Sequence, residues 1–193
     1  MTDGPRIAPL APADWPPEMK GALAALHPPA PRHPFPSRAE GRPKGLNVLG
    51  TLALHPQLAT AFHTFNGHIL FATTLTTRQR ELLVLRVATV RGSAYEWAQH
   101  VVLADDVGLS PEEVDRIAAG PDAPGWGALD GALVRAVDEL VADGAIGDAT
   151  WTALSAELDA QQLLDVIFTV GAYDALAMAL GSFRVELDDD LRR

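Results

Sequence analysis

Glu96 and His100 are two ionisable residues that lie four positions apart in a segment with helical periodicity. On a helical wheel they share a side with Leu103, Ala104 and Val107, which is the side expected to face the core. A carboxylate raises the proton affinity of a neighbouring imidazole, whereas burial raises the pKa of the carboxyl group itself. We therefore predict one proton donor and one acceptor near neutral pH, as general acid–base catalysis requires.

A third ionisable residue, Glu81, lies on the apolar side of the preceding helical segment. A lone carboxylate on such a side is destabilising unless it has a partner. If the two segments form a helical hairpin, Glu81, Glu96 and His100 converge, and the three groups titrate together. Arg86 follows Glu81 by five positions and is interpreted either as the counter-ion of a buried carboxylate or as a clamp for the carboxylate of a substrate.

The same residues permit two other interpretations. The Glu-x-x-x-His pair can be an ion pair that stabilises the core of a non-catalytic oligomeric binding protein. Glu81, Glu96 and His100 can instead bind a metal ion in a metal-dependent enzyme. The helix-bundle di-iron sites, however, use Glu-x-x-His, with ligands three positions apart, and this spacing is absent here. We predict a site with no metal and no cofactor.

The elements that position these residues are predicted to be helices. Apolar residues recur at helical spacing, and capping residues such as Ser110, followed by Pro111 and Glu113, indicate helix starts. No segment has the alternation of a β-strand. The last helix is strongly apolar, so we expect it to be central to the core. Helices are expected over residues 14–26, 56–72, 76–90, 93–107, 110–120, 128–142, 148–158 and 160–185.

Proline is concentrated in residues 1–45, which we predict to form an N-terminal arm with one short helix. This arm is expected to lie across its own domain or a neighbouring subunit. Residues 46–193 are predicted to form one all-helical domain. The expected fold class is therefore all-α, a compact helical bundle with a proline-rich arm.

The 193 residues carry a formal net charge of -10 and include no cysteine. The negative charge disfavours nucleic acid and anionic membranes as partners. The lack of cysteine excludes disulfides and thiol peroxidase chemistry. The N-terminal residues have no signal-peptide pattern, and charges interrupt the apolar runs, so we expect a cytoplasmic protein without a membrane span.

Three motifs follow one another along the chain: Arg80-Glu-Leu, then Tyr95-Glu-Trp with His100 after it, then Gly108-Leu-Ser. This order resembles the carboxymuconolactone decarboxylase and alkylhydroperoxidase D superfamily. The resemblance covers residues 46–187 and continues through Asp138-Glu-Leu, Trp151 and Val170-Gly-Ala-Tyr173. It implies an all-α fold of the alkylhydroperoxidase D-like type and a homo-oligomer, commonly a trimer or a hexamer.

In the peroxidase branch of that superfamily, a C-x-x-C pair is followed four residues later by a histidine, and a glutamate lies on the preceding helix. In this chain Ser93 and Glu96 stand at the two cysteine positions, His100 at the histidine and Glu81 at the glutamate. The chain is therefore similar to the decarboxylase-like branch, in which a carboxylate and the histidine transfer protons.

From the residues and the resemblance together, we expect a cofactor-free lyase or isomerase that acts on a small carboxylic acid or lactone. Its reaction would be a decarboxylation, an elimination or a double-bond shift. The expected catalytic residues are His100, Glu96 and Glu81. The expected substrate-binding residues are Arg86, Ser93, Trp97, Phe62 and Phe65.

Overall fold

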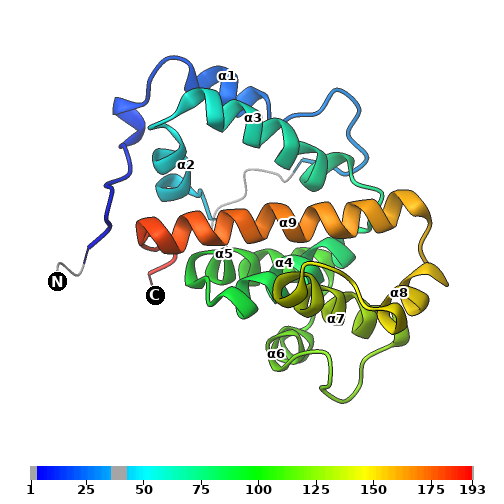
Figure 1. The fold of residues 1–193 in the computed structure, drawn as a ribbon. Coiled ribbons are helices and arrows are strands. Elements are labelled where there is room, and N and C mark those ends of the chain that lie inside the picture. The colour runs from blue at the N-terminus through cyan, green and yellow to red at the C-terminus, as the bar shows by residue number, and fades with distance from the viewer. Residues whose placement is uncertain (1–3, 36–42, 193) are drawn as a thin grey trace. The chain divides into compact units, whose positions relative to one another are not determined.

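The computed structural model describes residues 4–35 and 43–192, and within these residues every regular element is a helix (Figure 1). The all-helical fold class is confirmed. The chain divides into two compact units, the first formed by residues 1–73 and 179–193 and the second by residues 74–178. Neither boundary coincides with the predicted one between residues 45 and 46.

The second unit is built around α4 (Thr77–Arg91), whose residues from position 80 to position 88 are almost all buried. This helix packs against α5, α6 and α7, and α7 packs against α8. Within this unit α4 is the most completely buried helix, whereas α9 buries one face and exposes another. The surrounding helices are α5 (Ala94–Ala104), η3 (Asp105–Val107), α6 (Pro111–Ala119), α7 (Ala128–Asp143), α8 (Asp148–Ser155) and most of α9 (Ala160–Phe183).

Two residues, Gly92 and Ser93, connect α4 to α5. Gly92 has a φ of 61°, in the left-handed region that glycine adopts without steric strain, and it ends α4. The Ser93 N–H donates a hydrogen bond to the Ala88 carbonyl at 2.8 Å, so the chain reverses immediately. This short turn forms the helical hairpin that the convergence of Glu81 with His100 requires.

Polar contacts hold the neighbouring helices against α4. The predicted capping box of α6 is confirmed, because Ser110 and Glu113 exchange side-chain-to-backbone hydrogen bonds. Arg78 at the start of α4 donates to Glu113 at 2.5 Å and to Asp130 of α7 at 2.7 Å. Further along α4, Arg86 is bound to α7. The two contacts of Arg78 fix the first turns of α4, α6 and α7 relative to one another.

The part of α9 that belongs to the second unit is attached to both ends of α4. Asp165 accepts hydrogen bonds from the Thr74 N–H and hydroxyl, each at 2.6 Å, just before α4 begins. Asp174 forms an ion pair with Arg91 at the last residue of α4. These two carboxylates set the position of the residues between them, which include Tyr173.

α9 is also the one helix, among the residues that the structure describes, with the length and hydropathy to cross a membrane. Half of the tested stretch of α9 is buried inside the protein, and the core helix of a globular protein has the same length and hydropathy. The expected lack of a membrane span therefore stays a prediction.

In the first unit, α1 (Met19–Ala24) and α2 (Leu46–Leu52) pack against α3 (Pro56–Gly67) around a small apolar core. The single helix expected over residues 14–26 is instead a 3-10 turn, η1 (Pro12–Asp14), followed by α1. Pro16 and Pro17 account for the break, because proline disfavours a helical residue before it.

The proline-rich arm contacts its own unit beside the short π-helix η2 (His68–Ala72). The N–H groups of Arg32 and His33 both donate to the Phe71 carbonyl, and the Phe35 ring lies 4.5 Å from the Phe71 ring. Two parts of the predicted arm, residues 1–3 and 36–42, lie outside the described residues, as does residue 193 of the predicted domain.

Candidate active site

The two residues at the centre of the candidate site are Glu81 of α4 and His100 of α5, which the hairpin brings together. Their Oε2 and Nδ1 atoms lie 2.7 Å apart, and both side chains are buried. Burial by itself raises the pKa of Glu81, but the charges of His100 and Arg80 and their hydrogen bonds outweigh it, so this pKa lies below its ordinary value. An ionised carboxylate only accepts hydrogen bonds. The Nδ1–H of His100 therefore donates to Glu81, which leaves Nε2 as the nitrogen that can exchange a proton.

The arginine that contacts Glu81 is Arg80, not Arg86. The Nη2 of Arg80 donates to Glu81 Oε1 at 3.3 Å, and both side chains are buried. Arg86 forms two hydrogen bonds to Asp138, at 2.6 and 2.7 Å, and its Nη1 donates to the carbonyls of Ile117 and Ala118 near the end of α6. Arg86 thus joins three helices and is the counter-ion of a carboxylate, but that carboxylate belongs to Asp138 and not to Glu81.

Glu96 is the most unusual group of the site, because it is a carboxyl group with only 2% of its surface exposed. Neither of its oxygens has a hydrogen-bond partner among the described residues. Burial raises the pKa of Glu96 to about 7, against smaller lowering effects of the Ser93 hydroxyl and the His100 charge. At neutral pH Glu96 is therefore divided between its acid and carboxylate forms, which suits a proton carrier.

Ser93 lies beside Glu96 and has a buried hydroxyl of its own. This hydroxyl is near enough to lower the pKa of Glu96, yet it makes no hydrogen bond of normal geometry within the described part of the chain. Buried polar groups in proteins nearly always have a partner, which can be a water molecule or a ligand. The two oxygens of Glu96 and the Ser93 hydroxyl are therefore a place for a polar group from outside the chain.

Tyr173 of α9 completes the surroundings of His100. The two rings meet edge to face, with centroids 5.2 Å apart and an angle of 84° between their planes. Burial raises the pKa of the Tyr173 phenol, which stays neutral across the physiological range. In the sequence, Tyr173 was noted as the last residue of the Val170-Gly-Ala-Tyr173 motif. Its contact with His100 depends on the packing of α9, which residue spacing does not reveal.

The remaining predicted substrate-binding residues are distributed over both units. Trp97 lies on α5 and is partly buried. Phe62 and Phe65 lie on α3, in the first unit, where Phe62 is partly buried and Phe65 is exposed. The substrate-binding roles of these residues and of Ser93 and Arg86 stay predictions.

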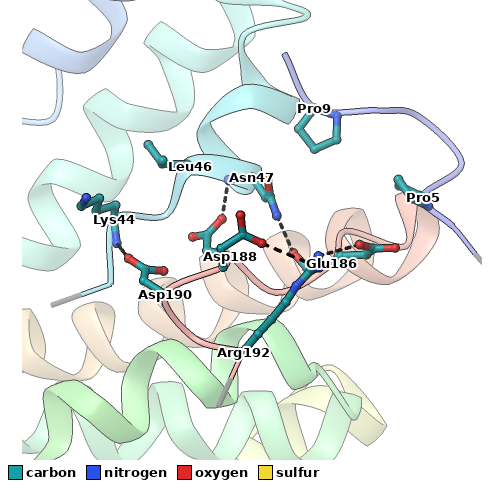
Figure 2. Close-up of a pocket in the computed structure, with 10 residues that line it drawn as sticks. Pro5, Pro9, Lys44, Leu46, Asn47, Glu186, Asp188, Asp190 and Arg192 are labelled. Carbon is teal, nitrogen blue, oxygen red and sulfur yellow. Dashed lines mark hydrogen bonds and ion pairs between the residues drawn. The ribbon is translucent and has the colours of Figure 1, made fainter. Parts of the chain in front are cut away.

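Within residues 4–35 and 43–192, no group of three His, Asp or Glu side chains is arranged to hold a metal ion. A cavity of about 340 Å³ lies in the first unit, lined by Pro5, Pro9, Asn47 and acidic residues of the C-terminal segment (Figure 2). One of these, Asp188, accepts a hydrogen bond from the Asn47 N–H at 2.7 Å. None of the residues around His100 lines this cavity, so it is separate from the candidate site.

A family model matches the part of the chain that contains the helical hairpin. The model of the carboxymuconolactone decarboxylase family matches residues 56–139, a range that includes Glu81, Glu96 and His100. No curated protein is similar enough to count as a match.

Solved structures have the same fold at low sequence identity. The alkylhydroperoxidase AhpD core of a peroxidase-related protein from Ralstonia eutropha is 19% identical, with a TM-score of 0.65 over 85% of this chain and 95% of that one. The debrominase Bmp8 is 12% identical, with a TM-score of 0.72 over 96% of this chain and 94% of that one. A variant of Bmp8 in complex with 2,3,4-tribromopyrrole is 13% identical, with a TM-score of 0.71 over 100% and 96%.

Proposed function

We propose that this chain belongs to the carboxymuconolactone decarboxylase and alkylhydroperoxidase D-like superfamily and is a cofactor-free lyase or isomerase acting on a small carboxylic acid or lactone. The observation that carries the proposal is the buried pairing of Glu81 with His100 next to the unpartnered carboxyl group of Glu96. The three groups provide an oriented base, its orienting carboxylate and an acid with a pKa of about 7.

In a double-bond shift, the Nε2 of His100 takes a proton from a carbon next to the substrate carbonyl. The electron pair of the C–H bond moves onto the carbonyl oxygen and gives an enolate. Glu96 then delivers its own proton to a different carbon of the same conjugated system, and the carbonyl forms again. A proton passes from His100 to Glu96, directly or through water, and restores both groups. General acid–base help of this kind contributes roughly 10²–10⁴-fold to a rate.

A decarboxylation would use the same groups with a different bond broken. The bond between the carboxyl carbon and its neighbour breaks, carbon dioxide leaves, and the electron pair moves onto a conjugated carbonyl oxygen. Glu96 protonates the carbon that lost the carboxyl group, and solvent replaces the proton of Glu96. The mechanism needs no thiol, in agreement with a chain that has no cysteine.

A small-molecule substrate is supported by the relatives. The family is named for a decarboxylase, and the fold of this chain is shared with a debrominase whose variant has been solved with 2,3,4-tribromopyrrole. The metal-dependent alternative is not favoured, because no three-residue ligand group exists among the described residues. The non-catalytic alternative gives no reason for a buried carboxyl group without partners.

Our proposal also covers the localisation, the assembly and the partners of the protein. We propose a cytoplasmic homo-oligomer, a trimer or a hexamer, that binds neither nucleic acid nor membranes. The formal net charge of -10 supports the last point, because such a surface repels phosphate groups.

The test measures proton transfer at carbon directly. The wild-type protein is incubated in deuterium oxide with a panel of unsaturated carboxylic acids, oxo acids and lactones, and the exchange of C–H for C–D is followed by proton NMR. We expect exchange with at least one compound, and a loss of at least about 10²-fold in His100→Ala and in Glu96→Gln. Glu157→Gln, at an exposed position, is the matched control and should exchange like the wild type. Exchange that persists in both folded site variants contradicts the mechanism.

A further inference from the structure

We propose that Tyr173 is a catalytic residue of this site, whose phenol O–H donates a hydrogen bond to the substrate carbonyl oxygen as that oxygen gains negative charge. This inference rests on the proposed function and names the group that stabilises its enolate. The base and the acid already described provide no such donor.

The position of Tyr173 supports this role. Its ring meets the His100 ring edge to face at 5.2 Å, so the two side chains are in direct contact. The charges of Glu81, Arg80 and Glu96 all act on the pKa of the phenol, which places its oxygen among the groups that surround His100. Only 4% of the residue is exposed, so an oxyanion beside it would be shielded from water.

The hydroxyl of Tyr173 is available to a ligand. Among the residues that the structure describes, no backbone or side-chain group forms a hydrogen bond with it. The hydroxyl oxygen is not among the fully buried polar atoms that lack a partner, so water or a polar group of a ligand can reach it. A phenylalanine would fill the same space but could not donate a hydrogen bond to such a group. The Ser93 hydroxyl and the Glu96 oxygens also lack partners, so several polar atoms near His100 can form hydrogen bonds with a polar ligand.

The chemistry of the phenol fits a donor and not a base. Burial raises the pKa of Tyr173, so the O–H keeps its proton in the range in which Glu96 titrates. A neutral donor held in a water-poor site stabilises a developing oxyanion more than the neutral carbonyl that precedes it. The division of roles is then complete: His100 removes the proton, Tyr173 holds the charge on oxygen, and Glu96 returns a proton.

The test compares the two tyrosines of the chain, Tyr95 and Tyr173. In Tyr173→Phe the ring and its contact with His100 remain and only the hydroxyl is lost. We expect kcat for the exchanging compound to fall by roughly 10²-fold, with KM changing by less than about threefold, because the hydrogen bond forms mainly in the transition state. Tyr95→Phe is the matched control, since Tyr95 is similarly buried and leaves α5 about 140° away from His100 around the helix. It should keep the kcat of the wild type.

A second measurement reads out substrate contact independently of rate. In the Tyr95→Phe background, fluorotyrosine incorporation labels position 173 alone, and its fluorine resonance should shift when the exchanging compound is added. Unchanged kcat in Tyr173→Phe, or an unshifted resonance at saturating compound, overturns the role of Tyr173 and leaves the proposed function intact. If the wild type exchanges no compound of the panel, the proposed function itself fails, and the role of Tyr173 fails with it.

Discussion

Glu96 combines two properties that rarely occur together: it is almost fully buried, and neither of its oxygens is hydrogen-bonded among the described residues. Burial raises its pKa from an ordinary 4.5 to about 7. The protein thus keeps a carboxyl group that weakens the folded state whenever it ionises. Such a group is retained where its proton is used, which is the situation in acid–base active sites.

The pKa of Glu96 predicts a pH-dependent effect of Glu96→Gln on stability. Because the folded state holds the proton more tightly, the unfolded chain binds fewer protons between pH 4.5 and 7, and the free energy of unfolding falls across that range. The loss amounts to about 3 kcal/mol for a pKa difference of this size. The amide of the variant does not titrate, so the stability of the variant relative to wild type should rise by that amount from below pH 4.5 to above pH 7.

Urea denaturation at a series of pH values measures this difference. Other titrating groups affect both proteins and cancel in the comparison. In Glu157→Gln, where the side chain is exposed, the difference from wild type should be the same at every pH. A constant difference for Glu96→Gln as well would mean that Glu96 titrates normally, and its role as an acid near neutral pH would be lost.

The residues that helical spacing brings together could be predicted from the sequence. Glu96 and His100 share a helix face, and the hairpin needed for Glu81 follows from the glycine between two helical segments. The partner of Glu81 could not be predicted in this way. Arg80 is adjacent to Glu81 in sequence, so their side chains leave the helix about 100° apart, and only the length and flexibility of arginine allow the contact.

At the scale of elements, the site depends on the turn between α4 and α5. Gly92 holds the left-handed conformation there, with a φ of 61°, and an added Cβ would meet no atom within 4 Å. A substitution at Gly92 would therefore act through backbone strain alone. Gly171 in α9 also has open space around its Cα, but it lies within a helix and has no positive φ. Because neither added Cβ would meet another atom, a comparison of the two substitutions isolates the effect of backbone strain at Gly92.

We predict that Gly92→Ala and Gly171→Ala have opposite effects. Gly92→Ala should destabilise the protein by about 1–2 kcal/mol, because an L-residue is strained in the left-handed region. Gly171→Ala should stabilise it by about 0.5–1 kcal/mol, because alanine is the better helix former. Thermal unfolding followed by circular dichroism measures both. Equal changes in stability for the two substitutions would show that the left-handed conformation of Gly92 adds no strain when alanine replaces it.

Element ends marked by local chemistry agreed with the structure, whereas features set by packing did not. The capping box at Ser110 and the glycine at position 92 act within one turn, so the sequence contains the information for them. The division into two units depends on which distant segments pack together, including residues 1–73 with 179–193. Such long-range pairing leaves no periodic signal. The near-complete burial of α4 was not predicted, because hydropathy alone does not identify the helix that is surrounded on most sides.

At the scale of the whole molecule, one face of α9 exposes a row of apolar side chains. Leu164, Phe168 and Met178 on this face are more than half exposed. The only charged residues of α9 are Asp165 and Asp174, and both are bound to α4 or the residues just before it. Two copies of a protein with a net charge of -10 repel each other over most of their surfaces, so an uncharged apolar face is where they can meet.

We therefore predict that the proposed homo-oligomer uses this face of α9. Met178→Glu adds a charge to it and should shift the protein toward smaller species in sedimentation velocity. Leu58→Glu, at a residue of α3 that is exposed to a similar degree, is the control and should sediment like the wild type. Dissociation by Leu58→Glu but not by Met178→Glu would place the interface elsewhere, and a monomeric wild type would end the proposal of an oligomer.

The turn formed by Gly92 and Ser93 has a consequence for how this site can evolve. His100 follows Glu81 by 19 positions, and only Gly92 and Ser93 lie between their two helices. One inserted residue in α5 before His100 would rotate its side chain by about 100° and carry it away from Glu81. Exchanges of side chain at positions 93 and 96 would leave that register untouched. Point substitutions at these two positions therefore change the chemistry beside His100 without moving it, whereas an insertion or deletion between the two helices would separate it from Glu81.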